Sequence, residues 1–442
     1  MVNFIYGILI VEIIIKDKKV YRRVDNIENF KKLIAVFEAQ NLLGNEIVET
    51  KIIDVEKNLL EHPFINPIIH SGEFTTSMAY DIMKCALNMA INLVDLGIFA
   101  FDLFPHQYTY IDGQWFLYDF DAFNIHPKNI KTQVRGTYKI VFSSFELLKI
   151  LTREEMKHCF LNRITNSTFY KMVDFKNWIL WFLKQTYCMF LFNLGLYQQT
   201  YKQLKKYFKE YDDKHSRKLY SFSVTDEELG IYSQIDDILT SQNIKNTFLL
   251  GEKSAQWAIK SMSDIKKFVY LDDYDLCDEY YNFIYQNNYK EISTAVIYPF
   301  MQDKEINLKY SYRGVYDYFA KERFYADAVL ILNSNELYMN KEFDVKEFCN
   351  NIVEFSTKLY IHKFNKNTEF ELAQKIQTEM HKYYYNVEFI ETANSLILIG
   401  KDKQLPLKDY SSLPKYLNGN RGAEAKQQSC ELLKILKNNK NS

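Results

Sequence analysis

Short apolar runs alternate with stretches of helical periodicity through the second half of the chain. Each run of four or five apolar residues is followed by a turn or capping residue and then an amphipathic segment, a pattern typical of strand–helix units in an α/β sheet. The pattern predicts strands at Thr247–Leu250, Phe268–Leu271, Thr294–Tyr298, Ala328–Leu332, Lys358–His362, Val387–Ile390 and Ser395–Ile399. Only four residues, Glu391 to Asn394, separate the last two strands, so we expect them to form a hairpin.

The first of these units carries a glycine turn and a terminal acid. Gly251 ends the first strand, Ser254–Ser261 permits a helix, and the second strand runs into Asp272, Asp273 and Asp275. Strand, glycine turn, helix, strand and acid open a nucleotide-binding sheet, in which the acid accepts hydrogen bonds from both ribose hydroxyls. Such loops usually carry two or three glycines, and this one has a single glycine. We assign the ribose role to Asp273, and capping of the next helix to Asp275.

The first half predicts a smaller α+β lobe followed by helices. A hairpin of Phe4–Ile15 and Lys19–Val24, a helix over Ile27–Leu43 stopped by Gly44, and a strand over Ile47–Val55 come first. A long helix over residues 76–96 follows. From Ser143 to about Lys218 the periodicity is helical, with an apolar helix at Trp178–Tyr197 and a lysine-rich segment, Tyr201–Arg217, interpreted as an exposed face.

The line between Phe99 and Phe123 resembles a protein-kinase catalytic loop. Asp-Gly in Ile111–Gln114 predicts a tight hairpin turn between two apolar runs. Asp102, Gln107 and Asp119 occupy the places of the catalytic Asp, the metal-binding Asn and the second metal-binding Asp. Gln replaces Asn, and no glycine-rich phosphate loop lies upstream. We therefore expect a kinase-like scaffold without phosphate transfer, and no metal site; in an active kinase these three residues would hold Mg²⁺.

Composition narrows the class of protein. The 442 residues are 47% hydrophobic and 25% charged with a formal net charge of −1, so no overall field draws the protein to nucleic acid or to an anionic membrane. The six cysteines form no CxxC pair, which indicates a reducing compartment. Lys184 and Gln185 interrupt the longest apolar helix, so we expect no membrane span and a cytoplasmic location. The oligomeric state stays open.

Two stretches carry a resemblance to a known family. Phe101–Gln107 with Tyr118-Asp119, and the line Glu322–Leu330 (ERFYADAVL), resemble bacterial S-adenosylmethionine (SAM)-dependent methyltransferases associated with nodulation and cell-surface carbohydrate modification. The resemblance covers about 60 to 400. It implies a kinase-like α+β domain at 1–222 and a class I methyltransferase (Rossmann-like) α/β domain at 223–402. Residues 403–442 lie beyond the resemblance, and their polar composition predicts a tail with a short amphipathic helix. Five alternating units followed by a hairpin are also the layout of that sheet.

The resemblance implies SAM as cofactor and suggests residues that bind it. Asp273 would bind the ribose, the segment around Gly251 the methionine part, and Asp303 the adenine amine. The cofactor-binding set is Gly251, Glu252, Ser254, Asp273, Asp303 and Asn333. Glu336 and His362 follow predicted strands, where open α/β sheets bind ligands, and either is a candidate base for a sugar hydroxyl.

Three functions follow as hypotheses. The first is an O-methyltransferase acting on a sugar of a capsular polysaccharide or lipopolysaccharide, with a sugar, nucleotide sugar or polysaccharide as acceptor. The second is a degenerate, non-catalytic protein that binds a glycan or a partner, which the missing glycines favour. The third is a small-molecule kinase using Asp102 and Asp119.

Overall fold

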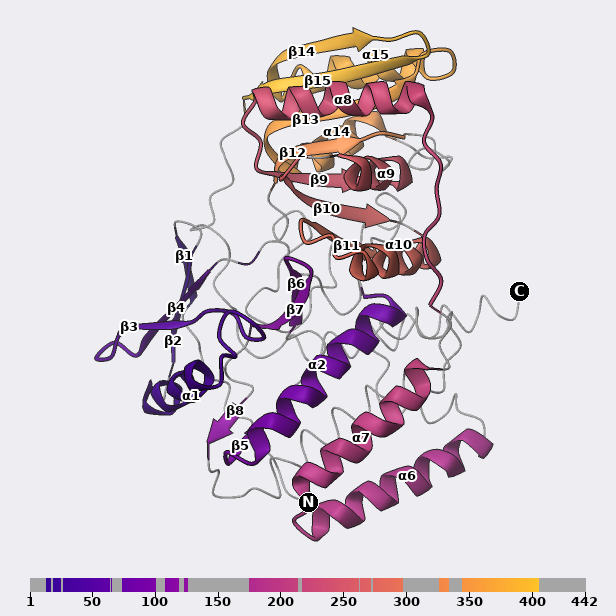
Figure 1. Cartoon of the computed structure of the whole chain (residues 1–442). Helices are drawn as coiled ribbons and strands as arrows, with labels where there is room; N and C mark the ends of the chain where they lie inside the picture. Colours follow the sequence, from indigo (N-terminus) through magenta and orange to yellow (C-terminus); the bar gives the residue numbers. More distant parts are fainter. Residues whose placement is uncertain are drawn as a thin grey trace.

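The computed structural model describes residues 13–16, 19–24, 27–63, 65, 74–100, 108–118, 123–125, 175–213, 217–261, 263–271, 273–296, 326–333 and 344–404. A large sheet with its helices forms one end of the molecule, and a small sheet with helices α1, α2, α6 and α7 forms the other (Figure 1). The two parts meet where helix α2 of the first half reaches helix α10 of the second.

The second half is a seven-stranded mixed sheet. Its strands are β9 (Asn246–Leu250), β10 (Lys266–Leu271), β11 (Ile292–Val296), β12 (Ala326–Ile331), β13 (Ser356–Asn365), β14 (Tyr384–Glu391) and β15 (Ser395–Lys403). The order is β11-β10-β9-β12-β13-β15-β14, parallel from β11 to β13, with β15 antiparallel to both neighbours. All seven predicted strands and the final hairpin are confirmed. Numbered along the chain, the order is 3-2-1-4-5-7-6.

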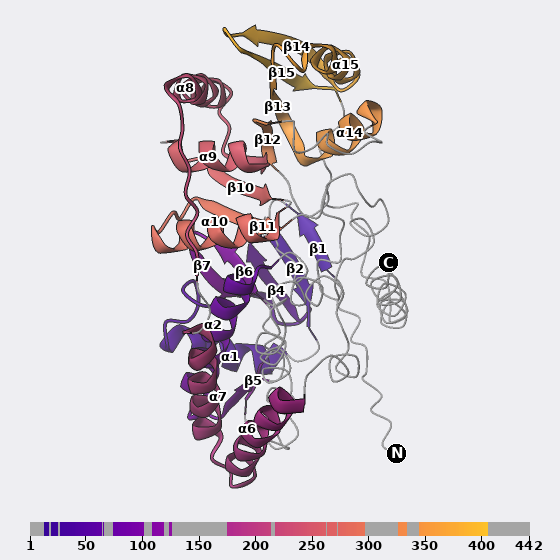
Figure 2. The ribbon, with the colours of Figure 1, turned by 90° about the vertical axis from the view of Figure 1, so that its right-hand side faces the viewer.

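Helices cover both faces of this sheet. Helices α8 (Asp226–Ser241), α9 (Glu252–Lys260) and α10 (Tyr274–Gln286) lie on one face, and α14 (Val345–Ile352) and α15 (Phe370–Met380) on the other (Figure 2). A 3₁₀ turn, Val353–Phe355, leads from α14 into β13. Because both faces are covered, central strands such as β10 are buried along almost their whole length and read as continuous apolar runs.

The small sheet of the first half is antiparallel, in the order β1-β2-β4-β3. Its elements are β1 (Ile13–Lys16), β2 (Lys19–Arg23), helix α1 (Ile27–Ala39), β3 (Lys51–Asp54) and β4 (Leu59–Pro63). The predicted hairpin of β1 and β2 is confirmed. The prediction placed the end of α1 too late, at Leu43, and β4, which pairs with both β2 and β3, was not predicted at all.

The remaining described elements are α2 (Thr76–Val94), β5 (Ile98–Ala100), β6 (Tyr108–Ile111), β7 (Gln114–Leu117), β8 (Phe123–Ile125), α6 (Phe175–Asn193) and α7 (Tyr197–Asp212). The turn between β6 and β7 is confirmed, since Asp112 and Gly113 both have positive φ, 49° and 80°. The lysine-rich segment lies largely in helix α7, where Lys202, Lys205, Lys206 and Lys209 are exposed, as predicted. The same helix also buries Tyr201 and Leu204. Among the helices of the described residues, none is long and apolar enough to cross a membrane.

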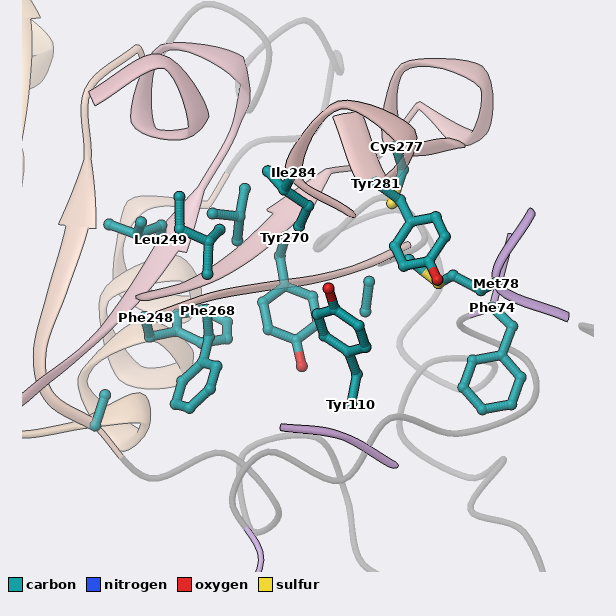
Figure 3. Close-up of a cluster of buried hydrophobic side chains, with 14 of the residues drawn as sticks. Phe74, Met78, Tyr110, Phe248, Leu249, Phe268, Tyr270, Cys277, Tyr281 and Ile284 are labelled. Carbon is teal, nitrogen blue, oxygen red and sulfur yellow. The ribbon is translucent and has the colours of Figure 1, made fainter. Parts of the chain in front are cut away.

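One apolar core runs from α2 through the hairpin into the large sheet. Within the sheet the rings of Phe248 and Tyr270 lie 4.7 Å apart between centroids. At the junction the ring centroids of Tyr110 and of Tyr281 in α10 lie 5.8 Å apart (Figure 3). Trp115 donates a hydrogen bond of 2.8 Å to the Tyr281 hydroxyl. The first half therefore packs directly on a helix of the large sheet.

Candidate functional site

The candidate site is the edge of the large sheet where the carboxyl ends of its central strands meet. The chain leaves β9 to form β10 on one side and later places β12 on the other, so β9 is the point at which the direction of winding reverses. Open α/β sheets bind ligands at such a switch point. Three predicted cofactor residues come together there: Gly251 after β9, Asp273 after β10 and Asn333 after β12.

Gly251 makes the turn from β9 into α9. Its φ of 82° and ψ of 167° lie in a region essentially confined to glycine. Its N–H donates to the Tyr270 carbonyl at 3.0 Å, and its carbonyl accepts from the Ala255 N–H at 3.1 Å. Gly251 is the N-cap of α9 and provides no side-chain cap hydrogen bond.

The two other residues predicted in this loop make protein contacts. Glu252 accepts hydrogen bonds from the Tyr220 hydroxyl at 2.9 Å and the Gln256 amide at 3.3 Å. The buried Ser254 hydroxyl accepts from the Leu332 N–H at 3.0 Å and donates to the Leu330 carbonyl at 3.4 Å. Ser254 thus fastens the start of α9 to the end of β12. Both hydrogen bonds of the Ser254 hydroxyl are therefore made within the fold.

Asp273 is the N-cap of α10. Its Oδ1 accepts a 2.7 Å hydrogen bond from the Leu276 N–H, and the side chain is exposed. The assignment of capping to Asp275 was wrong, because α10 begins at Tyr274 and Asp275 lies inside its first turn. Capping engages one carboxylate oxygen, and a carboxylate has two. A ribose role for Asp273 is therefore compatible with its place in the fold.

The prediction that His362 lies at the end of a strand is wrong. Strand β13 continues to Asn365, because β15 pairs with it up to that residue. The imidazole is fully buried, with Nδ1 2.6 Å from the Tyr360 hydroxyl and its ring centroid 4.0 Å from that of Phe364. Burial lowers the pKa of His362 well below its ordinary value, so the ring is neutral at pH 7. This position does not favour the predicted role as base.

Several predicted site residues lie outside the described residues. They are Asp303 and Glu336 of the predicted methyltransferase site, and Asp102, Gln107 and Asp119 of the kinase-like line. Their roles stay predictions, and so does the kinase-like character of the first half.

The sequence analysis did not predict a cluster of polar residues around the start of α9. Lys253 forms a 2.8 Å ion pair with Glu228 of α8, and the Tyr232 hydroxyl donates to the Lys253 carbonyl at 3.4 Å. Glu228 also completes a capping box with Thr225 at the start of α8. The sequence Thr-x-x-Glu before an apolar periodic run is the signal that could have revealed both α8 and this group. Together these contacts hold the glycine turn in one place.

Comparison with known proteins gives remote structural matches only. No family model and no curated protein matches the chain. The N-terminal domain of EvdMO1, crystallised with SAH (S-adenosylhomocysteine) and D-fucose, is 8% identical over 45% of this chain and 97% of that domain, with a TM-score of 0.29. The match to a longer EvdMO1 chain covers 41% of this chain and 43% of that one, with 9% identity and a TM-score of 0.28.

Two further matches are methyltransferases by name. Magnesium protoporphyrin IX methyltransferase (ChlM) from Synechocystis PCC 6803, with bound SAM, is 9% identical over 45% of this chain and 94% of that one, with a TM-score of 0.26. An rRNA methylase from Escherichia coli is 11% identical over 62% of this chain and 90% of that one, with a TM-score of 0.27. These TM-scores are too low to support an argument about this chain.

Proposed function

We propose that the chain is a SAM-dependent methyltransferase whose cofactor lies at the carboxyl ends of β9, β10 and β12. The observation that carries this proposal is the strand order 3-2-1-4-5-7-6 with an antiparallel β15, the layout that the family resemblance implies. The glycine turn at the switch point and an acid after the neighbouring strand support the same site. Residues 223–402 would form this unit and residues 1–222 its accessory half.

Gly251 and Asp273 are compatible with SAM binding at this edge of the sheet. Gly251 has no side chain to obstruct the turn, and the exposed Asp273 carboxylate can accept from ribose hydroxyls. When bound, SAM would supply an electrophilic methyl group: an O–CH₃ bond would form to the acceptor as the S–CH₃ bond breaks and SAH leaves. The task of the chain is therefore to hold the acceptor in line, exclude water and accept one proton from the acceptor hydroxyl. Of the two predicted bases, His362 is buried within β13, so we assign the proton-accepting role to Glu336.

The acceptor we propose is a sugar hydroxyl of a bacterial surface polysaccharide or of its nucleotide-sugar precursor. The support for this finer proposal is the resemblance of Glu322–Leu330 to the carbohydrate-modifying family. Transfer of a labelled methyl group to nucleotide sugars and polysaccharide tests it. SAM binding without transfer to any of these acceptors would instead favour the degenerate, non-catalytic protein.

Cofactor binding is tested by calorimetry and thermal melts with SAM and with SAH. A ligand bound only by the folded state, at one hundred times its Kd, stabilises that state by about 2.7 kcal/mol. Asp273→Asn keeps a good N-cap but removes the charge, so we expect weaker SAM binding at an almost unchanged melting temperature. Asp54→Asn is the matched control, since Asp54 accepts from the Lys57 N–H at 2.9 Å in the remote small sheet. No binding at millimolar SAM would refute the proposal.

A second variant tests the glycine turn. Gly251→Ala forces a side chain into a conformation that costs about 1–3 kcal/mol, so the turn should shift and SAM affinity should fall. Gly195→Ala imposes comparable strain at φ 78° in a turn between α6 and α7. If both variants lower the melting temperature but only Gly251→Ala weakens binding, the turn is part of the site. Equal SAM affinity in the two variants would contradict that role.

A further inference from the structure

The starts of α2 and α10 meet through polar side chains. The Thr76 and Tyr274 hydroxyls lie 2.9 Å apart. Asp278 accepts from the backbone N–H of Ser77 at 2.9 Å and from its hydroxyl at 3.1 Å. One turn further along both helices, the Tyr281 hydroxyl donates to Asp81 Oδ2 at 2.9 Å. All six residues are buried, with exposed fractions of 0% to 4%: Thr76, Ser77, Asp81, Tyr274, Asp278 and Tyr281.

A buried polar contact of this kind fixes the register of two helices. An apolar interface can slide by a fraction of a turn at little cost, whereas a buried hydroxyl or carboxylate that loses its partner costs the full desolvation penalty. The Ser77 N–H belongs to the first turn of α2, where backbone N–H groups have no partner within the helix. Asp278 of α10 supplies that partner and places a negative charge at the positive end of α2.

The register set here extends to the cofactor site. Tyr274 is the first residue of α10, and Asp273, the proposed ribose ligand, is its N-cap. The Thr76–Tyr274 contact therefore holds the residue next to Asp273, and the Ser77–Asp278 contact holds the following turn.

We propose that Thr76 and Ser77 are positioning residues for the SAM site, so that the first half of the chain sets the place of the Asp273 carboxylate. The inference rests on the proposed function, because it concerns the same acid. In this arrangement α2 makes no contact with the cofactor. A displacement of α2 nevertheless changes the affinity for the cofactor, because it moves Asp273.

The test measures the Kd for SAM in full-length variants that each lose one hydroxyl. Thr76→Val and Tyr274→Phe keep nearly the same shape, and we expect each to weaken binding about fivefold to tenfold. The double variant should be no weaker than either single variant, because both remove the same hydrogen bond. Thr76→Ser keeps the hydroxyl, so this variant should bind SAM with the same Kd as wild type.

The control is Asn282→Ala, at the other end of α10, where the Asn282 amide donates to the Lys218 carbonyl at 3.2 Å. It should lower the melting temperature and leave the Kd unchanged, which separates positioning from general weakening of the interface. If wild type binds SAM and Thr76→Val binds it equally well, the inference is overturned and the proposed function stands. If wild type binds no SAM, both fall.

Discussion

The ion pair between Asp81 and Arg217 allows a stability prediction to be worked from the structure. Arg217 donates to Asp81 through both terminal nitrogens, at 2.9 and 3.0 Å, and Tyr281 adds a third hydrogen bond to the same carboxylate. The Asp81 side chain is 5% exposed and that of Arg217 18%. Burial alone would lower the pKa of Arg217, but Asp81 and then Asp212 outweigh it and raise the pKa, so the guanidinium stays charged.

Asp81→Asn keeps the shape of the side chain and removes its charge. Breaking a buried pair at one partner costs about 3–5 kcal/mol. We expect the lower end, about 3 kcal/mol, because Arg217 is partly exposed and keeps Asp212 at 2.9 Å. The free energy of unfolding, measured by urea denaturation followed by circular dichroism, should fall by that amount.

The matched control is Asp112→Asn, which breaks the exposed pair of Asp112 with Lys266, whose side chains are 58% and 53% exposed. Asn suits the positive φ of this turn position, so only the ion pair is lost. Exposed pairs contribute about 0–1 kcal/mol. If Asp81→Asn costs no more than Asp112→Asn, the reasoning from burial is refuted.

Two further predictions concern the large sheet. A Cβ at Gly400 would lie 2.9 Å from the buried ring of Tyr384, so Gly400→Ala should lower the free energy of unfolding by about 1–3 kcal/mol, while Gly230→Ala, with open space around it, should not. The pKa of His362 is lowered in the folded protein, so below about pH 6.5 the unfolded state binds more protons than the folded state. The free energy of unfolding should therefore decrease as pH falls, by up to about 1.4 kcal/mol per pH unit. His362→Gln should lack this component in urea midpoints compared between about pH 5 and about pH 7; an unchanged slope would contradict it.

The seven strands could be predicted because each is a local apolar run between turn signals, and the hairpin because four residues leave no other connection. Strand ends were less accurate, since they depend on neighbours distant in sequence. β13 extends past His362 only because β15 pairs with it as far as Asn365. Because of this pairing, His362 lies inside the sheet and not at its edge, where the prediction placed it.

Other errors have similar causes. Three acids follow β10, and only the observed start of α10 shows that Asp273 is its cap. β4 ends in Pro63 and alternates half-buried with buried residues, so it gives no continuous apolar run. In α7 the exposed lysines were predicted correctly, and only the buried Tyr201 and Leu204 between them were not identified. The contacts between α2 and α10 join hydroxyls and carboxylates that, taken alone, predict exposed positions.

Those contacts also constrain how the chain acquires its structure during synthesis. The partners Thr76–Tyr274, Ser77–Asp278 and Asp81–Tyr281 are separated by 198, 201 and 200 residues. α2 leaves the ribosome long before α10 exists, with Asp81 and two hydroxyl residues on the face it must later bury. Contacts of such high sequence separation slow folding, and apolar surface that waits for them is prone to aggregation. We therefore expect the newly synthesised first half to be most prone to aggregation in the interval before α10 is made.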